Sequence, residues 1–356
     1  MKITKLNSII VLAAALFASC TEQVDVDMHT TINSDGSCTR IVSYNSVMSK
    51  EMRDSLWTDS TKRKAQPVPE CLEIKGYSYQ LTTVGSGDKV TTTLDHRYDN
   101  VAQMTEDMPL QLNGQQLRAT STFEKRFRWF YTEYTFTEVF ACISDNFKLP
   151  VTDYADDEIV GFWFTGYPNL LEGLSGAEAA DEINRIEPSI SKWLQDNIFQ
   201  LNFEFIVNHY DSIVNPPVSL SQFVERRSEL EEYIMQSGDI LLADHRKLFK
   251  DFFHSDAFAV FFTDTPSGKE LERANVKLLN IFNLSASYTI TMPGRIIDAG
   301  TGYCQNDTVF YQLTGERLIP HDYTITATSR DVNTWPNIVT MLAVIVLIVY
   351  SIRRKK

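Results

Sequence analysis

Apolar and polar residues alternate with a period of two along the first part of the chain. The alternation covers Val24–Tyr44 and Tyr77–Leu94, each with turn residues near its middle, and returns over Leu117–Phe140. Two alternating runs that flank a short turn are typical of a β-hairpin, because a strand places successive side chains on opposite faces. Residues 20–153 are therefore predicted to be the β-rich first part of a domain.

The period changes to that of amphipathic helices between residues 154 and 283. A serine followed three residues later by Glu or Gln is a capping box, which indicates the start of a helix. Such boxes pair Ser175 with Glu178, Ser219 with Gln222, and Ser267 with Glu270. Pro188 is expected to interrupt the first of these helices and restart it. The centre of the chain is thus predicted to be a helical insertion.

Alternation with a period of two returns over residues 284–334. Strands are expected at Ser287–Thr291, Arg295–Ala299, Thr308–Leu313 and Asp322–Thr328, with turn residues between them. This segment is predicted to be a β-meander that completes the domain. The order β-rich, helical, β-rich predicts an α+β fold, in which both flanks form one antiparallel β-rich domain around the helical insertion.

Residues 1–19 have the three parts of a secretory signal peptide. Lys2 and Lys5 precede an apolar run, Ile9–Phe17, which is too short to span a bilayer, and small residues come just before Cys20. The segment resembles the lipobox of bacterial lipoproteins, in which this cysteine receives a diacylglyceryl group before cleavage. The resemblance implies that Cys20 is lipidated and holds the chain to membrane lipid. An ordinary signal peptide with an incidental cysteine is the alternative.

The C-terminal end carries a second membrane signal. Residues 338–352 are almost entirely aliphatic, Trp335 precedes them, and four basic residues, 353–356, end the chain. Counted over 335–352, the helix is about 18 residues and roughly 27 Å long, which suffices for a transmembrane helix with Trp335 at one interface. The positive-inside rule places 353–356 in the cytoplasm as a basic stub. A buried C-terminal helix is the alternative.

The two ends agree on where the domain lies. They place it on the periplasmic side of the inner membrane, with an outer-membrane lipoprotein as the alternative. The whole chain has a formal charge of −13, but without the six basic residues at its two ends 27 basic residues face 46 acidic ones, a charge of −19. Such an acidic surface repels nucleic acid, so no nucleic-acid partner is expected.

Cysteine and motif spacing indicate no reaction chemistry. Cys38, Cys71, Cys142 and Cys304 follow Cys20, and an oxidising compartment would allow one or two disulfides among them, with four buried thiols as the alternative. No Cys-x-x-Cys, His-Glu-x-x-His, Gly-x-Ser-x-Gly or complete phosphate-loop motif occurs in the sequence. The sequence therefore predicts no metal, no cofactor and no catalytic residue.

The two β-rich flanks resemble a known family. The hairpin Thr31–Ser37 looks like the opening of LppM-type domains, and Tyr288–Ile297 with Asn306–Leu313 looks like their closing strands. The resemblance implies an exported, membrane-anchored α+β module that binds a lipid or another envelope component and is not catalytic. The helical centre departs from that family, and the lipobox with this composition is similar to envelope lipoproteins of Bacteroidetes.

Aromatic and basic residues are concentrated in Phe123–Tyr131. One interpretation is a ligand wall, in which Arg126 and Arg128 bind an anionic headgroup while Trp129 and Tyr131 line the apolar part. The alternative is a central strand whose aromatic face is core and whose arginines pair with the acidic surface. These four residues are the candidate binding residues of the chain.

The sequence as a whole favours a non-catalytic lipoprotein module that is tethered to the membrane on the periplasmic side. Its expected partner is an envelope lipid or glycolipid, or a membrane protein. A structural subunit of an inner-membrane complex is the first alternative. An envelope hydrolase with an unrecognised site is the second, so enzymatic activity stays open.

Overall fold

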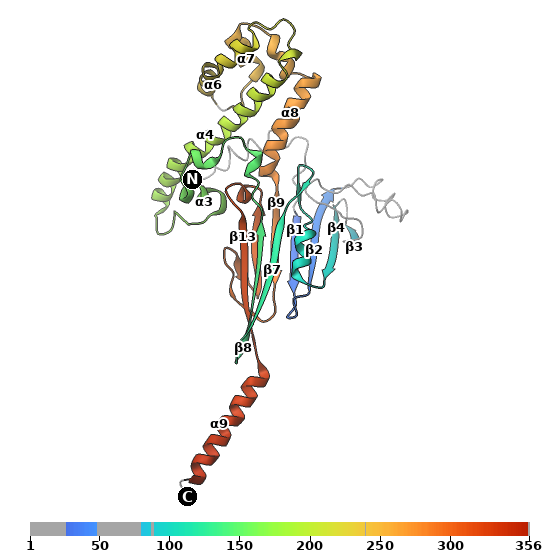
Figure 1. The fold of residues 1–356 in the computed structure, drawn as a ribbon, viewed down its shortest axis with the longest axis vertical. Coiled ribbons are helices and arrows are strands. Elements are labelled where there is room, and N and C mark those ends of the chain that lie inside the picture. Colours follow the sequence, from blue (N-terminus) through green and yellow to red (C-terminus); the bar gives the residue numbers. More distant parts are fainter. Residues whose placement is uncertain (1–25, 48–79, 87–88, 239, 355–356) are drawn as a thin grey trace. The chain divides into compact units, whose positions relative to one another are not determined.

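The fold is α+β, as the sequence predicts. A computed structural model describes residues 26–47, 80–86, 89–238 and 240–354; the signal peptide, Cys20 and Cys71 lie outside these residues. The chain divides into two compact units (Figure 1). The helical unit contains Cys142–Leu284 and Gly315–His321, so it extends beyond the expected insertion. The β unit contains Val24–Ala141, Ser285–Thr314 and Asp322–Lys356.

Strands from both flanks build the large sheet of the β unit. Within the described residues its seven strands have the order β11-β12-β9-β1-β2-β4-β3. Their bounds are β1 Val26–Ile32, β2 Cys38–Val47, β3 Gln80–Ser86, β4 Lys89–Tyr98, β9 Ser285–Thr291, β11 Tyr303–Gln305 and β12 Thr308–Thr314. The two predicted hairpins are present as antiparallel pairs, β1 with β2 and β3 with β4. Gly36 has a φ of +89° in the first turn, which is a conformation that glycine adopts without strain.

A small sheet packs against the large one. In the described part of the chain it has four strands in the order β10-β13-β8-β7. Its strands are β7 Ala119–Phe127, β8 Tyr131–Phe140, β10 Arg295–Asp298 and β13 Tyr323–Val332. A 3-10 helix, η3 (Val101–Glu106), and a short pair, β5 Gln111–Leu112 with β6 Gln115–Gln116, connect the sheets along the chain. The inward residues of both sheets, such as Met28, Phe136, Tyr288 and Ile325, form one buried core.

The C-terminal strands do not form the expected meander. β9 joins the large sheet beside β1, and their pairing is parallel, whereas β10 pairs with β13 in the small sheet. Alternation predicts that a segment is a strand, but it does not determine the partner of that strand. The partner depends on which pairing buries the most apolar side chains in the shared core. In this pairing β9 and β12 bury Tyr288, Ile290 and Val309 on the inner face of the large sheet.

Helices make up most of the helical unit. They are α3 Asp157–Thr165, α4 Gly176–Asn208, α5 Leu220–Glu225, α6 Arg227–Gln236, α7 His245–Phe253 and α8 Pro266–Leu279. Short 3-10 helices are η4 Ser144–Asn146, η5 Val151–Asp153, η6 Tyr210–Ser212, η7 Ala257–Phe261, η8 Asn280–Asn283 and η9 Glu316–Leu318. Aromatic rings dominate the packing. Phe223 and Phe258, for example, are fully buried, and their ring centroids are 5.4 Å apart.

Helix α4 continues through Pro188, so the predicted interruption is wrong. The capping box of Ser175 and Glu178 is formed as expected, and the helix then runs for 33 residues. A proline inside a helix costs about 3 kcal/mol. Ile186 and Ile190 are buried on either side of Pro188, and the burial of this apolar stripe outweighs the local cost.

The N-cap of helix α8 lies two residues before the expected one. Thr265, not Ser267, is the N-cap: its Oγ1 accepts a hydrogen bond from the Gly268 amide at 3.0 Å, and Pro266 occupies the first helical position. Proline is favoured there because its φ suits a helix and its missing N–H would have no partner anyway. The capping box of Ser219 with Gln222 does form, at the start of α5.

Replacing Thr265 with alanine is therefore expected to cost about 1 kcal/mol of stability in the helical unit, the usual value of an N-cap. Ser267→Ala is the matched control and is expected to change stability by less, because the hydrogen bond of the Ser267 hydroxyl within the described residues is a long one, to Ser212 at 3.3 Å. Urea unfolding of both variants checks this. An equal loss in the two variants would contradict the assignment of the cap.

Candidate functional site

The four candidate binding residues lie together at one end of the β7–β8 hairpin. Arg126 is near the end of β7, Arg128 and Trp129 are in the turn, and Tyr131 begins β8. β7 is the outermost strand of the small sheet, so the alternative interpretation as a central strand is wrong. Residues 127–131, called the hairpin tip below, form an exposed surface: Arg128, Trp129 and Phe130 are all exposed.

Trp129, one of these four residues, contacts helix α9 (Thr334–Arg354) near the C-terminus. The indole Nε1 of Trp129 donates a hydrogen bond to Thr340 Oγ1 at 2.9 Å, and its ring meets the Trp335 ring edge-on at 5.5 Å. The guanidinium of Arg330 lies 4.5 Å above the Tyr131 ring. Arg126 pairs with Glu124 at 2.7 Å, with both side chains more than half exposed. The role of these residues as ligands stays a prediction.

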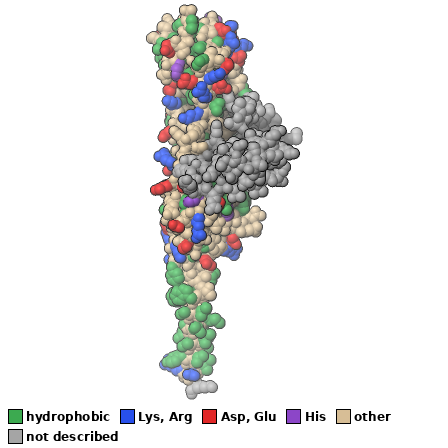
Figure 2. Space-filling model, turned by 90° about the vertical axis from the view of Figure 1, so that its right-hand side faces the viewer, with side chains coloured by type: hydrophobic (Ala, Val, Ile, Leu, Met, Phe, Trp, Pro, Cys, Tyr) green, Lys and Arg blue, Asp and Glu red, His purple; other side chains and the backbone are tan. Residues whose placement is uncertain are grey.

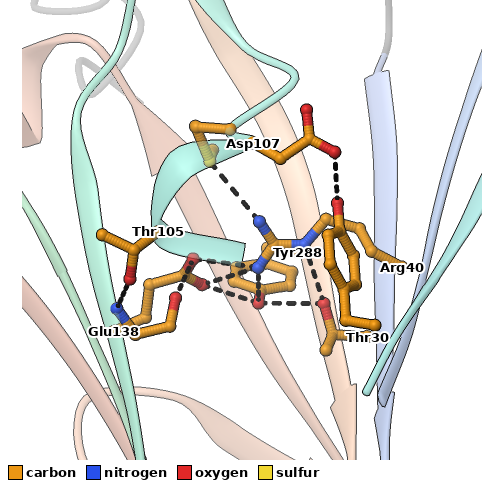
Figure 3. A network of polar contacts seen from close by, with 9 residues as sticks. Thr30, Arg40, Thr105, Asp107, Glu138 and Tyr288 are labelled. Atoms are coloured by element: carbon orange, nitrogen blue, oxygen red, sulfur yellow. Dashed lines mark hydrogen bonds and ion pairs between the residues drawn. The ribbon is translucent and has the colours of Figure 1, made fainter. Parts of the chain in front are cut away.

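A buried polar network connects the two sheets of the β unit (Figure 3). Arg40 on β2 donates from Nη2 to both carboxylate oxygens of Glu138 on β8, at 2.9 and 3.0 Å. Tyr288 on β9 donates its hydroxyl to Glu138 at 2.7 Å and accepts from Arg40 at 2.9 Å. Thr30 accepts from Arg40 Nε at 3.2 Å, and Ser121 donates to Glu138 at 3.0 Å. Both charged side chains are completely buried.

Burial also determines the protonation of neighbouring groups. Desolvation raises the pKa of the Tyr288 phenol well above its usual value. Desolvation likewise raises the pKa of the Cys38 thiol to about 11, despite the opposing charge of Arg40. Both groups are therefore neutral near pH 7, and a neutral buried thiol is a poor nucleophile. The network holds β2, β8 and β9 in one arrangement and presents no reactive group to solvent.

Sequence reasoning missed this network, although a signal was present. Arg40 occupies an inward position in the alternation that also buries Cys38 and Val42. Glu138 occupies the same kind of position between Phe136 and Phe140. A charged residue at an apolar position of an alternating strand is costly unless it is paired. Two such residues of opposite sign predict a buried ion pair. From the sequence alone, this pair would have predicted that the strand of Arg40 lies against the strand of Glu138 in the core.

A cavity of about 490 Å³ opens within the helical unit, between α4, α7, α8 and the segments beside them. Its apolar lining includes Ile198, Phe261 and Leu271. Asn202 and Asn275, which are hydrogen-bonded to each other at 2.7 Å, add amide groups to this lining. A concave site with an apolar lining and a few polar groups is the usual form of a small-ligand site.

The rim of this cavity is polar and mainly acidic. Asp244, Asp264 and Glu272 line it together with Arg246. Arg246 pairs with Asp256 at 2.7 Å, and Asp264 pairs with Lys269 at 2.8 Å. Desolvation lowers the pKa of His245, whose Nε2 lies 2.8 Å from the Ile240 carbonyl oxygen. A carbonyl oxygen can only accept a hydrogen bond, so Nε2 carries a proton. Because its pKa is lowered, the imidazole is neutral near pH 7. The cavity therefore suits a molecule with an apolar body and a neutral or cationic polar end.

Helix α9 is the third feature of functional interest. It is 21 residues long, and its most apolar 18-residue stretch has a mean hydropathy of 2.1 and is only 6 % buried, so the helix is long and apolar enough to cross a membrane. Figure 2 shows hydrophobic side chains along its surface, with basic residues at the far end. The predicted span 335–352 lies inside this helix.

Comparisons with known proteins add little to this geometry. No protein-family model and no curated protein matches the chain. The NMR structure of the folded domain of Mycobacterium tuberculosis LppM aligns with 88 % of this chain and 94 % of that domain, at 7 % sequence identity and a TM-score of 0.27. An identity and a TM-score this low establish neither a common family nor a common function.

Proposed function

We propose that this protein is a membrane-tethered lipoprotein module of the bacterial envelope that binds an envelope component and does not act as an enzyme. The observation that carries this proposal is α9, which leaves the small sheet directly after β13 and exposes its apolar side chains around its circumference. Exposed aliphatic side chains on this scale are unfavourable in water and favourable in a bilayer.

The proposed arrangement follows from the charges at the ends of the chain. Arg353 and Arg354 end α9, and two lysines follow them, so the positive-inside rule orients the helix with these residues in the cytoplasm. The rest of the chain then lies on the periplasmic side of the inner membrane. Lipidated Cys20 provides a second anchor at the other end of the mature chain. A helix anchors more firmly than acyl chains do.

The cavity of the helical unit is the proposed binding site for the envelope component. Its volume, about 490 Å³, is within the range of small-ligand sites. Its apolar lining suits an acyl or other hydrocarbon part, and the acidic rim disfavours a strongly anionic headgroup. A lipid or glycolipid with a neutral or cationic polar part fits this chemistry.

Purification of the full chain from membranes, followed by mass spectrometry of co-purifying lipids, tests the site. Ala243 lines the cavity at its rim and is partly exposed, so Ala243→Trp fills the entrance without disturbing the core. Leu242→Trp is the matched control, because Leu242 is 52 % exposed and not part of the lining. We expect a bound lipid in the wild type and the control, and a loss of it in Ala243→Trp.

Two results would contradict this assignment. Equal amounts of lipid in both variants would place the binding elsewhere on the chain. Reproducible absence of any lipid from the wild type would reject the lipid-binding function itself.

A further inference from the structure

Large aromatic side chains are exposed at the hairpin tip, beside the start of α9. Phe127 is 56 % exposed, Trp129 47 % and Phe130 50 %, and Trp335 on α9 is 57 % exposed. The Phe127 and Trp335 rings are nearly parallel, with their centroids 6.4 Å apart. The rings of Phe127 and Trp129 both contact that of Trp335, so they form an aromatic patch that joins two segments separated by about 200 residues in the sequence.

Hydrogen bonds of Asn333 hold the hairpin tip to the first residues of α9. The Asn333 amide N–H donates to the Phe130 carbonyl at 3.0 Å, and its side-chain Nδ2 donates to the Arg128 carbonyl at 2.6 Å. Its Oδ1 accepts from the Thr132 hydroxyl at 2.7 Å. One residue thus uses three polar groups to hold the tip next to the start of the helix.

The contact with Thr340 determines how far the tip reaches along the helix. Thr340 lies six residues after Thr334, which is about 9 Å along the axis at 1.5 Å per residue. The interfacial layer on each side of the hydrocarbon core is about 5–7 Å thick. A tip that reaches Thr340 therefore extends to the depth of this layer when α9 spans the bilayer.

We infer that the hairpin tip inserts into the headgroup layer of the membrane that α9 spans and acts as a second, protein-borne membrane contact. Trp129 and Trp335 are the residue type that prefers this layer, because an indole has an apolar ring and a polar N–H. Arg126 and Arg128 are exposed beside the aromatic rings and can bind lipid phosphates there. The contact fixes the orientation of the β unit on the membrane surface, and it rests on the proposed span.

Quenching of tryptophan fluorescence by brominated lipids tests this inference. The full chain is reconstituted into vesicles of phosphatidylcholine and phosphatidylglycerol whose acyl chains carry bromine near the headgroup. Trp129→Phe isolates the signal of position 129. Thr120→Trp combined with Trp129→Phe keeps all five tryptophans but moves one to an exposed site on β7, the strand that precedes the hairpin tip. That site is seven residues from Phe127, or about 23 Å along the strand.

We expect the fluorescence of position 129 to be quenched and that of position 120 to remain at its level in unbrominated vesicles. Equal quenching at the two positions, or none at position 129, overturns the inference. An alkaline carbonate wash of vesicles prepared with Cys20→Ser protein, in which α9 is the remaining proposed anchor, separates this failure from that of the proposed function. Protein that stays in the membrane with Trp129 unquenched rejects only the contact of the tip, whereas protein that is washed off rejects the span.

Discussion

Replacement of Glu138 with alanine is expected to lower the free energy of unfolding of the β unit by about 3–5 kcal/mol, the usual loss when one partner of a buried ion pair is removed. The Arg40 guanidinium would stay buried without its carboxylate, since both side chains have no exposed surface. The hydroxyls of Tyr288 and Ser121 would lose their acceptor at the same time.

The double variant Arg40→Met with Glu138→Leu is the control for this prediction. Removing both charges leaves no unpaired ion, and apolar replacement of a whole buried pair is often neutral or stabilising. We therefore expect the double variant to be more stable than Glu138→Ala. Hydrogen exchange of β8 and β9 amides in urea is the suitable measurement, because it reports on the β unit whether or not the helical unit unfolds with it. A double variant as unstable as Glu138→Ala would show that the pair itself adds stability.

Arginines in the middle of α9 are expected to abolish its insertion into the membrane. Val344 and Leu347 lie near the centre of the helix and are 48 % and 63 % exposed. An arginine at the centre of a membrane span costs about 2.5–3.5 kcal/mol on the insertion scale, so Val344→Arg with Leu347→Arg costs roughly 5–7 kcal/mol. Such a cost prevents stable insertion of a helix of this length.

Combination with Cys20→Ser separates the two anchors. The arginine variant alone is expected to stay in the membrane fraction through lipidated Cys20, and Cys20→Ser alone through α9. The chain with both changes is expected in the soluble periplasmic fraction. Immunoblots of fractionated cells measure this. Release of the arginine variant on its own would show that Cys20 carries no lipid, and retention of the combined variant would contradict the tether through α9.

Local sequence patterns were sufficient for the elements whose cause is local. The hairpin of β1 and β2 follows from its alternation and the Asn33–Gly36 turn, and the capping boxes at Ser175 and Ser219 form as expected. Helix α9 follows from length and composition alone. In each case the cause lies in one short stretch of the sequence, so no contact with a distant segment is needed to predict the element.

The candidate site could be predicted only as a set of residues. The concentration of aromatic and basic side chains in 123–131 was visible in the sequence. Their contact with Trp335 and Thr340 was not, because those residues are about 200 positions away. The cavity of the helical unit could not be predicted either, since its lining comes from four separate segments that meet only in the folded chain.

By itself the sequence determined the α+β class, the order of the strands and helices along the chain, and an apolar C-terminal helix ending in basic residues. Only the tertiary structure decided that β9 pairs in parallel with β1, that β10 and β13 join the other sheet, and that α4 continues through Pro188. The physical reason is the same in each case. Periodicity and capping residues report the preference of a segment for a local conformation. Strand partners and a tolerated proline depend instead on the burial of apolar area and of paired charges, such as Arg40 with Glu138. These groups become buried only when distant segments meet.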